Sequence, residues 1–336
     1  MFPTDYAGAL KSMRMSKLTA CLLVAMLAIA EPWPASAQAE YPNRTIKFVV
    51  PIPPGVVADT LPRIIAEKLS AQWGQPVIIE NRPGAALNLG AEVVAKASPD
   101  GYTLLATPQG PLVISQSFFP KLGFDPSAFV PVSIYAELPY LVVVNPKVPA
   151  STLQELIAYA KANPGKVNYA SSGVGSSLHL TIEMLAGTAG IRVVHVPYQG
   201  AAPALNDVLA GHVEMMIDNL GNSLPLAREG KLKVLAVTGA TRIPELPDVP
   251  AVAELYPGFF STGWYAVVAP PKTPETIATK LSRAIAETLK LPDIAKRFRD
   301  LAITPTGTTS AEAAAFLRQE AARWRQVIVS RGIKPD

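Results

Sequence analysis

Short apolar runs alternate with longer stretches in which apolar residues recur every three or four positions, from residue 46 onward. The runs predict β-strands, and the longer stretches predict helices with one buried face. The expected strands are 46–50, 77–80, 103–107, 140–144, 193–196, 213–217, 234–237 and 264–269. Two further helices are expected near 274–290 and 310–330. This alternation predicts an α/β fold built on mainly parallel sheets that helices flank.

Several helix ends carry recognisable signals. Asp59 is expected to cap the helix after the first strand, and Ser151 with Gln154 predicts a capping box for the helix that follows residue 150. Pro203 is expected to open a later helix, and Gly211 to end it.

The strand–helix rhythm occurs twice, which predicts two lobes. Residues 145–260 contain a complete set of strands and helices, and the strands at 140–144 and 264–269 are expected to cross between the lobes. The predicted first lobe comprises residues 38–142 and 264–336, and the second comprises residues 143–263.

The first 37 residues have the pattern of a cleaved signal peptide. A basic segment (Lys11, Arg14 and Lys17) precedes an apolar run at 18–30, and Ala-Ser-Ala at 35–37 matches a cleavage site. The apolar run is shorter than the roughly 20 residues that span a bilayer. We therefore expect export to the periplasm, with translation starting at Met1, Met13 or Met15.

Composition excludes several classes of function. The only cysteine, Cys21, lies in the predicted signal peptide, so no disulfide is expected in the exported part. The net charge of +4 is spread without basic runs, so no nucleic-acid partner is expected. His179, His195 and His212 form no pair at helical spacing, so neither a metal nor a cofactor is predicted. His179, in a first helical turn, is expected to be neutral and hydrogen-bonded.

Residues 168–180 form the most informative stretch: a short strand, a turn of glycines and serines, and a helix start. Gly173 and Gly175 permit a backbone that turns N–H groups into one concavity, and Ser176 or Ser177 is the expected N-cap. A helix N-terminus favours an anion. Because no nucleotide-binding loop or nucleophile elbow is present, the stretch predicts anion binding rather than bond cleavage; the alternative is an ordinary capped turn.

A set of short motifs follows in one order along the chain. They are Tyr41-Pro42, Val50-Pro51, Gly55 with Asp59, Glu80-Asn81-Arg82-Pro83-Gly84-Ala85, Pro99-Asp100-Gly101-Tyr102-Thr103-Leu104, Ser171-Ser172-Gly173-Val174-Gly175, His195-Val196-Pro197-Tyr198-Gln199-Gly200, Asp218-Asn219 and Leu246-Pro247-Asp248-Val249-Pro250. With them the chain resembles the Bug family, the solute-binding receptors of tripartite tricarboxylate transporters. The resemblance implies a two-lobed periplasmic binding protein of type II-like fold. It also implies a monomer that binds a small carboxylate and delivers it to membrane permease subunits.

The resemblance also implies which residues contact the ligand. They are Pro53, Pro54, Gly55, Val56, Asp59, Thr107, Ser171, Ser172, Gly173, Val174, Gly175, Ser176, Ser177, Tyr198, Gly200, Ala201 and Asp218. Asp218 is expected to act through water or to brace its loop. Val56 stands where the family usually has glycine, and Pro54 where it has a small residue, which gives weight to a bulkier or aromatic acid.

Two alternatives from other classes stay open. A periplasmic hydrolase would use Ser177 and His179, although no complete set of nucleophile, base and orienting group is recognisable. A partner of a membrane sensor kinase would use the same binding chemistry for signalling.

Overall fold

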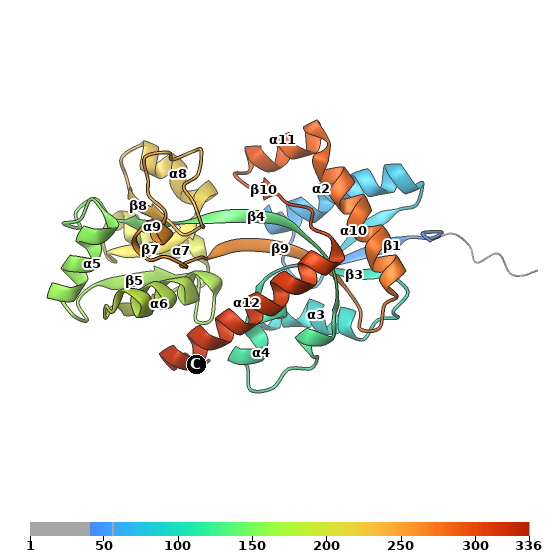
Figure 1. Ribbon diagram of the computed structural model, residues 1–336, viewed down its shortest axis with the longest axis horizontal. Helices are drawn as coiled ribbons and strands as arrows, with labels where there is room; N and C mark the ends of the chain where they lie inside the picture. The colour runs from blue at the N-terminus through green and yellow to red at the C-terminus, as the bar shows by residue number, and fades with distance from the viewer. Residues whose placement is uncertain (1–40, 56, 336) are drawn as a thin grey trace, which may run out of the picture. The chain divides into compact units, whose positions relative to one another are not determined.

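The computed structural model describes residues 41–55 and 57–335 (Figure 1). The predicted signal peptide, with Cys21, lies outside these residues, and so does Val56. Residues Arg44–Asp336 form one compact unit, to which the description below refers.

Ten strands alternate with helices along this unit. The strands are β1 (Ile46–Val50), β2 (Val77–Asn81), β3 (Thr103–Pro108), β4 (Val130–Val144), β5 (Asn168–Ser171), β6 (Val194–Pro197), β7 (Met215–Asn219), β8 (Lys233–Val237), β9 (Thr262–Ala269) and β10 (Thr304–Pro305). The predicted strands, including the short one at the start of residues 168–180, are thus confirmed. The ends that were predicted agree within two residues, except that β4 starts ten residues earlier than predicted.

The α-helices are α2 (Val57–Trp73), α3 (Asn88–Ala95), α4 (Ser115–Phe118), α5 (Leu153–Ala162), α6 (Ser177–Ala189), α7 (Ala201–Ala210), α8 (Leu220–Arg228), α9 (Val252–Leu255), α10 (Glu275–Lys290), α11 (Pro292–Asp300) and α12 (Ser310–Arg331). Short turns of other helix types are η1 (Ala85–Leu87), η2 (Gly110–Ile114) and η3 (Pro126–Ala128). No helix in the described part of the chain is both long and apolar enough to cross a membrane.

The strands follow the order β2-β1-β3-β9-β4-β7-β5-β6, with β8 and β10 also paired to β4. The strand pairs β2-β1, β1-β3, β7-β5 and β5-β6 are parallel, as predicted. The central strands β9 and β4 pair antiparallel with each other and with their neighbours, so the sheet is mixed rather than mainly parallel. The chain leaves the first set of strands along β4 and returns to it along β9, so these two strands run in opposite directions.

Strand β4 changes partner midway. Its residues Val130 to Pro139 pair with β9, whereas Tyr140 to Val144 pair with β7 and β8. Figure 1 shows β4 and β9 as the two long central strands. The change of partner coincides with the predicted crossing at 140–144.

Helix caps differ in part from the predictions. Ser176 caps α6 as predicted, since its Oγ accepts from the His179 N–H at 3.2 Å. For α5, Thr152 rather than Ser151 is the cap, and it accepts from the Glu155 N–H at 3.1 Å. The Glu155 carboxylate, and not Gln154, accepts from the Ser151 N–H. The capping residues thus lie one position later than predicted.

Two other helices, α2 and α7, begin slightly earlier than predicted. Asp59 is the third residue of α2 and accepts from the Gly55 N–H, so it lies inside the first turn instead of at the cap. Helix α7 ends at Gly211 as predicted and begins two residues before Pro203.

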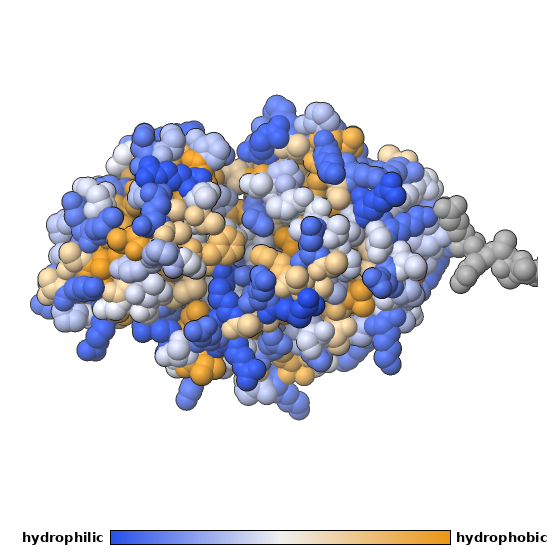
Figure 2. Space-filling model, viewed as in Figure 1, coloured by the Kyte–Doolittle hydropathy of each residue, from blue (hydrophilic) through white to orange (hydrophobic). Residues whose placement is uncertain are grey.

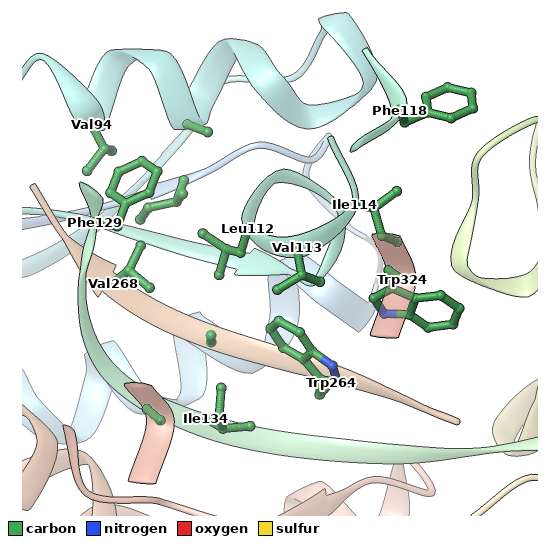
Figure 3. Packing of buried hydrophobic residues seen from close by; sticks show 14 of the residues in the cluster. Val94, Leu112, Val113, Ile114, Phe118, Phe129, Ile134, Trp264, Val268 and Trp324 are labelled. Atoms are coloured by element: carbon green, nitrogen blue, oxygen red, sulfur yellow. The ribbon is translucent and has the colours of Figure 1, made fainter. Parts of the chain in front are cut away.

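The largest buried side chains, Trp264 of β9 and Trp324 of α12, belong to one hydrophobic cluster with residues of η2 and α4 (Figure 3). The indole N–H of Trp264 donates to Glu320 Oε2 at 3.0 Å, so α12 is joined to the central strands by a buried hydrogen bond. The predicted core position of Trp324 is confirmed. The face drawn in Figure 2 mixes hydrophilic and hydrophobic residues.

Candidate ligand-binding site

A cavity of about 400 Å³ lies where the loop before α6 meets the β3–α4 segment and the central strands. This is the size of a small-molecule site. It is lined by Ala86, Leu87, Pro108, Gln109, Gly110, Ile114, Ser115, Phe118, Phe119, Leu138, Tyr140, residues 172–178, Ala201, Asn219, Gly263, Trp264 and Tyr265. In Figure 3 the Phe118 ring points away from Leu112 and Val113.

The loop before α6 has the backbone that the glycines predict. Gly173 has φ +126° and Gly175 has φ +75°, a region that other residues rarely adopt. The Gly175 N–H, however, donates to His179 Nδ1 at 3.0 Å. The expectation that this N–H serves an anion is therefore wrong: a histidine one helical turn later takes it.

The first two N–H groups of α6 remain for a ligand. Ser177 and Leu178 begin the helix and line the cavity, and N–H groups at these positions have no partner within a helix. The next N–H, of His179, goes to the Ser176 cap. The Ser177 hydroxyl lies 3.0 Å from the Tyr140 hydroxyl, which also lines the cavity. The residues that line the cavity at the positive end of the helix dipole thus contribute two N–H groups and two hydroxyls.

An aromatic stack supports the loop from behind. The rings of His179 and His195 are parallel within 9°, with centroids 3.9 Å apart, and Tyr169 stacks on His195. Burial, together with the neighbouring His195, lowers the pKa of His179 to about 4. The neutral form is required here because only a neutral imidazole has a nitrogen that accepts from the Gly175 N–H. The predicted neutral, hydrogen-bonded His179 is confirmed.

The structure divides the predicted ligand residues into two sets. Those that line the cavity are Ser172, Gly173, Val174, Gly175, Ser176, Ser177 and Ala201. Those that are described but do not line it are Pro53, Pro54, Gly55, Asp59, Thr107, Ser171, Tyr198, Gly200 and Asp218. Val56 lies outside the described residues.

Asp59 holds the first loop to its neighbours. Its carboxylate accepts from the Gly55 N–H at 3.0 Å, from the Arg63 guanidinium at 2.9 Å and from the Asn81 amide at 2.7 Å. Burial alone would raise the pKa of Asp59, but hydrogen bonds from Arg63 and Asn81 outweigh it and lower the pKa.

Asp218 is fully buried and braces the start of α8. It accepts from the Ser223 hydroxyl at 2.8 Å and from the Asn222 amide at 3.2 Å. Burial raises the pKa of this carboxyl. These bonds fit the loop-bracing role that was predicted as one of its two alternatives.

Several lining residues were not predicted as ligand contacts: Gln109, Phe118, Phe119, Leu138, Tyr140, Asn219, Trp264 and Tyr265. Gln109 comes two residues after Thr107, at the end of a predicted strand, and this position is the signal that could have identified it. Asn219 has the same signal, since it follows the predicted strand 213–217 by two residues. The others reach the cavity through tertiary packing, which no local pattern reveals.

The arrangement does not form the pair that a hydrolase would use. Ser177 Oγ lies beside Tyr140, whereas His179 Nδ1 accepts from Gly175. A second serine–histidine pair, Ser171 Oγ with His195 Nε2 at 2.6 Å, is closely spaced, but Ser171 is fully buried and does not line the cavity. Among the described residues no cluster of potential ligands for a metal ion is present.

Known proteins are similar to this chain over most of its length. The family model described as "Tripartite tricarboxylate transporter family receptor" matches residues 61–333. Protein BugT of Bordetella pertussis is 36% identical over 327 residues, covering 96% of this chain and 99% of BugT.

Two solved structures are also similar. Rpa4515 of R. palustris with adipate has a TM-score of 0.76 at 35% identity, covering 88% of this chain and all of that one. MatC (Rpa3494) of Rhodopseudomonas palustris with bound malate has a TM-score of 0.72 at 34% identity, covering 86% of this chain and all of that one. The fold is thus that of a periplasmic binding protein, as predicted. The chain belongs to the tripartite tricarboxylate transporter receptor family, a class of solute-binding receptors.

Proposed function

We propose that this protein is a receptor without catalytic activity that binds a small carboxylate at the start of α6. The observation that carries the proposal is the pair of N–H groups of Ser177 and Leu178 at the wall of a ligand-sized cavity. The similar structures with adipate and with malate support the same class of ligand.

The electrostatics of the cavity favour one carboxylate at this place. A helix N-terminus stabilises an anion by about 0.3–1 kcal/mol, and by up to about 2 kcal/mol where it is partly buried. Hydrogen bonds from N–H groups to a charged acceptor are stronger than those to neutral ones. No aspartate or glutamate lines the cavity in the described part of the chain, so no carboxylate of the protein is in direct contact with a ligand there.

The biological setting follows from the family and from the sequence. We infer that residues 1–37 direct export, and that the protein works as a monomer in the periplasm and delivers its ligand to permease subunits. The lobes proposed are residues 38–142 with 264–336, and residues 143–263. The change of partner within β4 supports a boundary near residue 140.

Thermal unfolding with a panel of acids, adipate and malate included, tests the binding function. A ligand at about a hundred times its dissociation constant adds roughly 2.7 kcal/mol to stability. The dimethyl esters of the same acids, which have no charge, should give no shift. If no acid raises the melting temperature, the carboxylate assignment is wrong.

The same esters test the absence of catalysis. We expect no methanol release above the uncatalysed rate, because Ser177 has no histidine beside it. Ester turnover that Ser177→Ala abolishes would support the hydrolase instead. Copurification with permease subunits, rather than with a sensor kinase, would support the role in transport.

A further inference from the structure

Three consecutive residues at the edge of the cavity have a left-handed backbone. Ala85, Ala86 and Leu87, which form η1, have φ +49°, +51° and +75°. Each would be less strained as glycine, because in this conformation a Cβ atom crowds the following carbonyl oxygen. Among the described residues that are not glycine, only Lys272 and Ala302 also have positive φ, and each of them stands alone. Strained backbone of this kind is concentrated at functional sites, where the surrounding structure holds it in place.

Contacts on both sides of α3 hold this turn. Asn88, the first residue of α3, accepts from the Ser115 hydroxyl at 2.8 Å, and both side chains are buried. A Cβ atom on Gly90 would lie 2.9 Å from Pro51 Cβ, so the first turn of α3 lies close against the residue that follows β1. Because the start of α3 is fixed in this way, the turn that leads into it is held as well.

Burial in the core does not account for the side chains of the turn. None of its three residues is buried: Ala85 and Ala86 are exposed, and Leu87 is half-buried. Core packing therefore does not offset the strain that these side chains cause, and a different contact is expected to explain them. The cavity provides the place for such a contact, since Ala86 and Leu87 line it, whereas Ala85 does not.

Leu87 and Ser177 line the cavity from different sets of strands. Leu87 precedes α3, which packs on β1 and β3, whereas Ser177 begins α6, which packs on β5 and β7 (Figure 1). Leu87 Cδ1 lies 3.8 Å from the position that a Cβ atom of Gly110 would take, so the side chain lies over the start of η2. Ligand atoms that extend from the start of α6 toward β1 and β3 would meet this side chain.

We propose that Leu87 determines specificity by limiting the length of the carboxylate that the cavity accepts. This inference rests on the proposed function and concerns the part of the ligand far from α6. The left-handed turn places a branched side chain where glycine would leave room for the ligand. In an apolar pocket, room for one methylene group changes selectivity by about 10–200-fold, so the loss of the branched group should admit longer acids.

Titration calorimetry with malate, adipate and suberate, three acids of increasing length, tests the proposal. Leu87→Ala removes the branched end of the side chain but keeps a residue other than glycine at the strained position. The affinity for suberate relative to that for malate should rise at least about tenfold in this variant. A ratio that is unchanged or lower in the folded variant would overturn the proposal.

Ala85→Gly is the matched control, because it relieves strain in the same turn without changing a residue that lines the cavity. It should alter the suberate-to-malate ratio less than about twofold, although it makes the turn more flexible. Leu87→Met, which restores most of the bulk, should return the ratio to within about threefold of the native value. An equal rise in Ala85→Gly would mean that stiffness of the turn, and not the Leu87 side chain, limits the length, and would overturn the proposal.

The same titrations separate this inference from the proposed function. If the native protein binds malate or adipate and Leu87→Ala has the native ratio, the role of Leu87 is wrong and the carboxylate receptor stands. If neither protein binds any of the three acids, this inference is wrong, and a thermal shift with another acid would still support the receptor. If no acid at all shifts the melting temperature, both are wrong.

Discussion

The packing of the loop before α6 makes Gly175→Ala a sharp test of the structure. Gly175 has φ +75°, and a Cβ atom there would lie 2.7 Å from two carbons of the Phe118 ring. Ordinary contact begins near 3.4 Å, so the ring or the loop must move by about 0.7 Å. The substitution therefore combines backbone strain with overpacking.

The two contributions can be estimated separately. A left-handed backbone at a residue other than glycine costs about 1–2 kcal/mol. Overpacking adds at most about 1–3 kcal/mol, and the lower value applies if the Phe118 ring shifts into the cavity that it lines. Gly175→Ala should thus lower the free energy of unfolding by about 2–5 kcal/mol. Gly190→Ala, at the other end of α6, is the matched control, because Gly190 has φ +64° but nothing within 4 Å of its Cβ position.

Urea unfolding of both variants and of Phe118→Leu measures these effects. Gly190→Ala should lose only the strain, about 1–2 kcal/mol. In the Gly175→Ala background Phe118→Leu should be less destabilising than in the native protein, by about 1 kcal/mol or more, because it relieves the contact. Equal losses for the two glycine variants, with additive effects of Phe118→Leu, would refute this account of the loop.

Three further predictions concern other buried groups. Glu320→Ala should lower the free energy of unfolding by about 3–5 kcal/mol, because the partly buried Arg323 loses its carboxylate partner and the buried Trp264 indole N–H loses its acceptor. Glu287→Ala, in an exposed pair with Arg283, should lower it by about 0.5 kcal/mol or less in the same urea titration. The pKa of His179, about 4 against 6.5 when free, means that its contribution to stability is complete above about pH 6.5 and is lost as the pH falls toward 4, by up to about 3 kcal/mol. His179→Gln should flatten the pH dependence of stability in that window, and an unchanged slope would contradict the assignment. Asp59→Asn should lower stability by about 1–2 kcal/mol, because it weakens the bonds from Gly55, Arg63 and Asn81. It should change carboxylate affinity less than about threefold, because Asp59 does not line the cavity; a large loss of affinity with unchanged stability would instead make Asp59 a ligand contact.

Local patterns predicted most of the strands because each is a short apolar run between turns. The first half of β4 escaped prediction because Pro131 and Pro139 interrupt it, and proline usually argues against a central strand. The structure accommodates Pro131 beside an irregularity in the pairing with β9, and Pro139 at the point where β4 changes partners.

The anion site was predictable to the extent that it is local. The glycine angles and the Ser176 cap follow from residues 171–177 alone, so the sequence sufficed for them. That His179 takes the Gly175 N–H depends on a side-chain rotamer, which spacing does not determine. The wall formed by Gln109, Phe118 and Tyr140 comes from separate segments of the chain, and only the folded sheet brings these residues together.

If the N–H groups at the start of α6 hold a carboxylate, Ser177→Pro should bind it more weakly than Ser177→Ala does. Proline is well tolerated at the first position of a helix, and Ser176 has the extended backbone that a following proline requires. Both variants lose the hydroxyl, but only Ser177→Pro also loses the N–H.

Calorimetry with the acid that gives the largest thermal shift supplies the measurement. We expect Ser177→Pro to bind this acid more weakly than Ser177→Ala by about 1.5–3 kcal/mol, roughly tenfold to a hundredfold, with the same circular-dichroism spectrum. Equal affinities of the two folded variants would show that the Ser177 N–H does not hold the carboxylate.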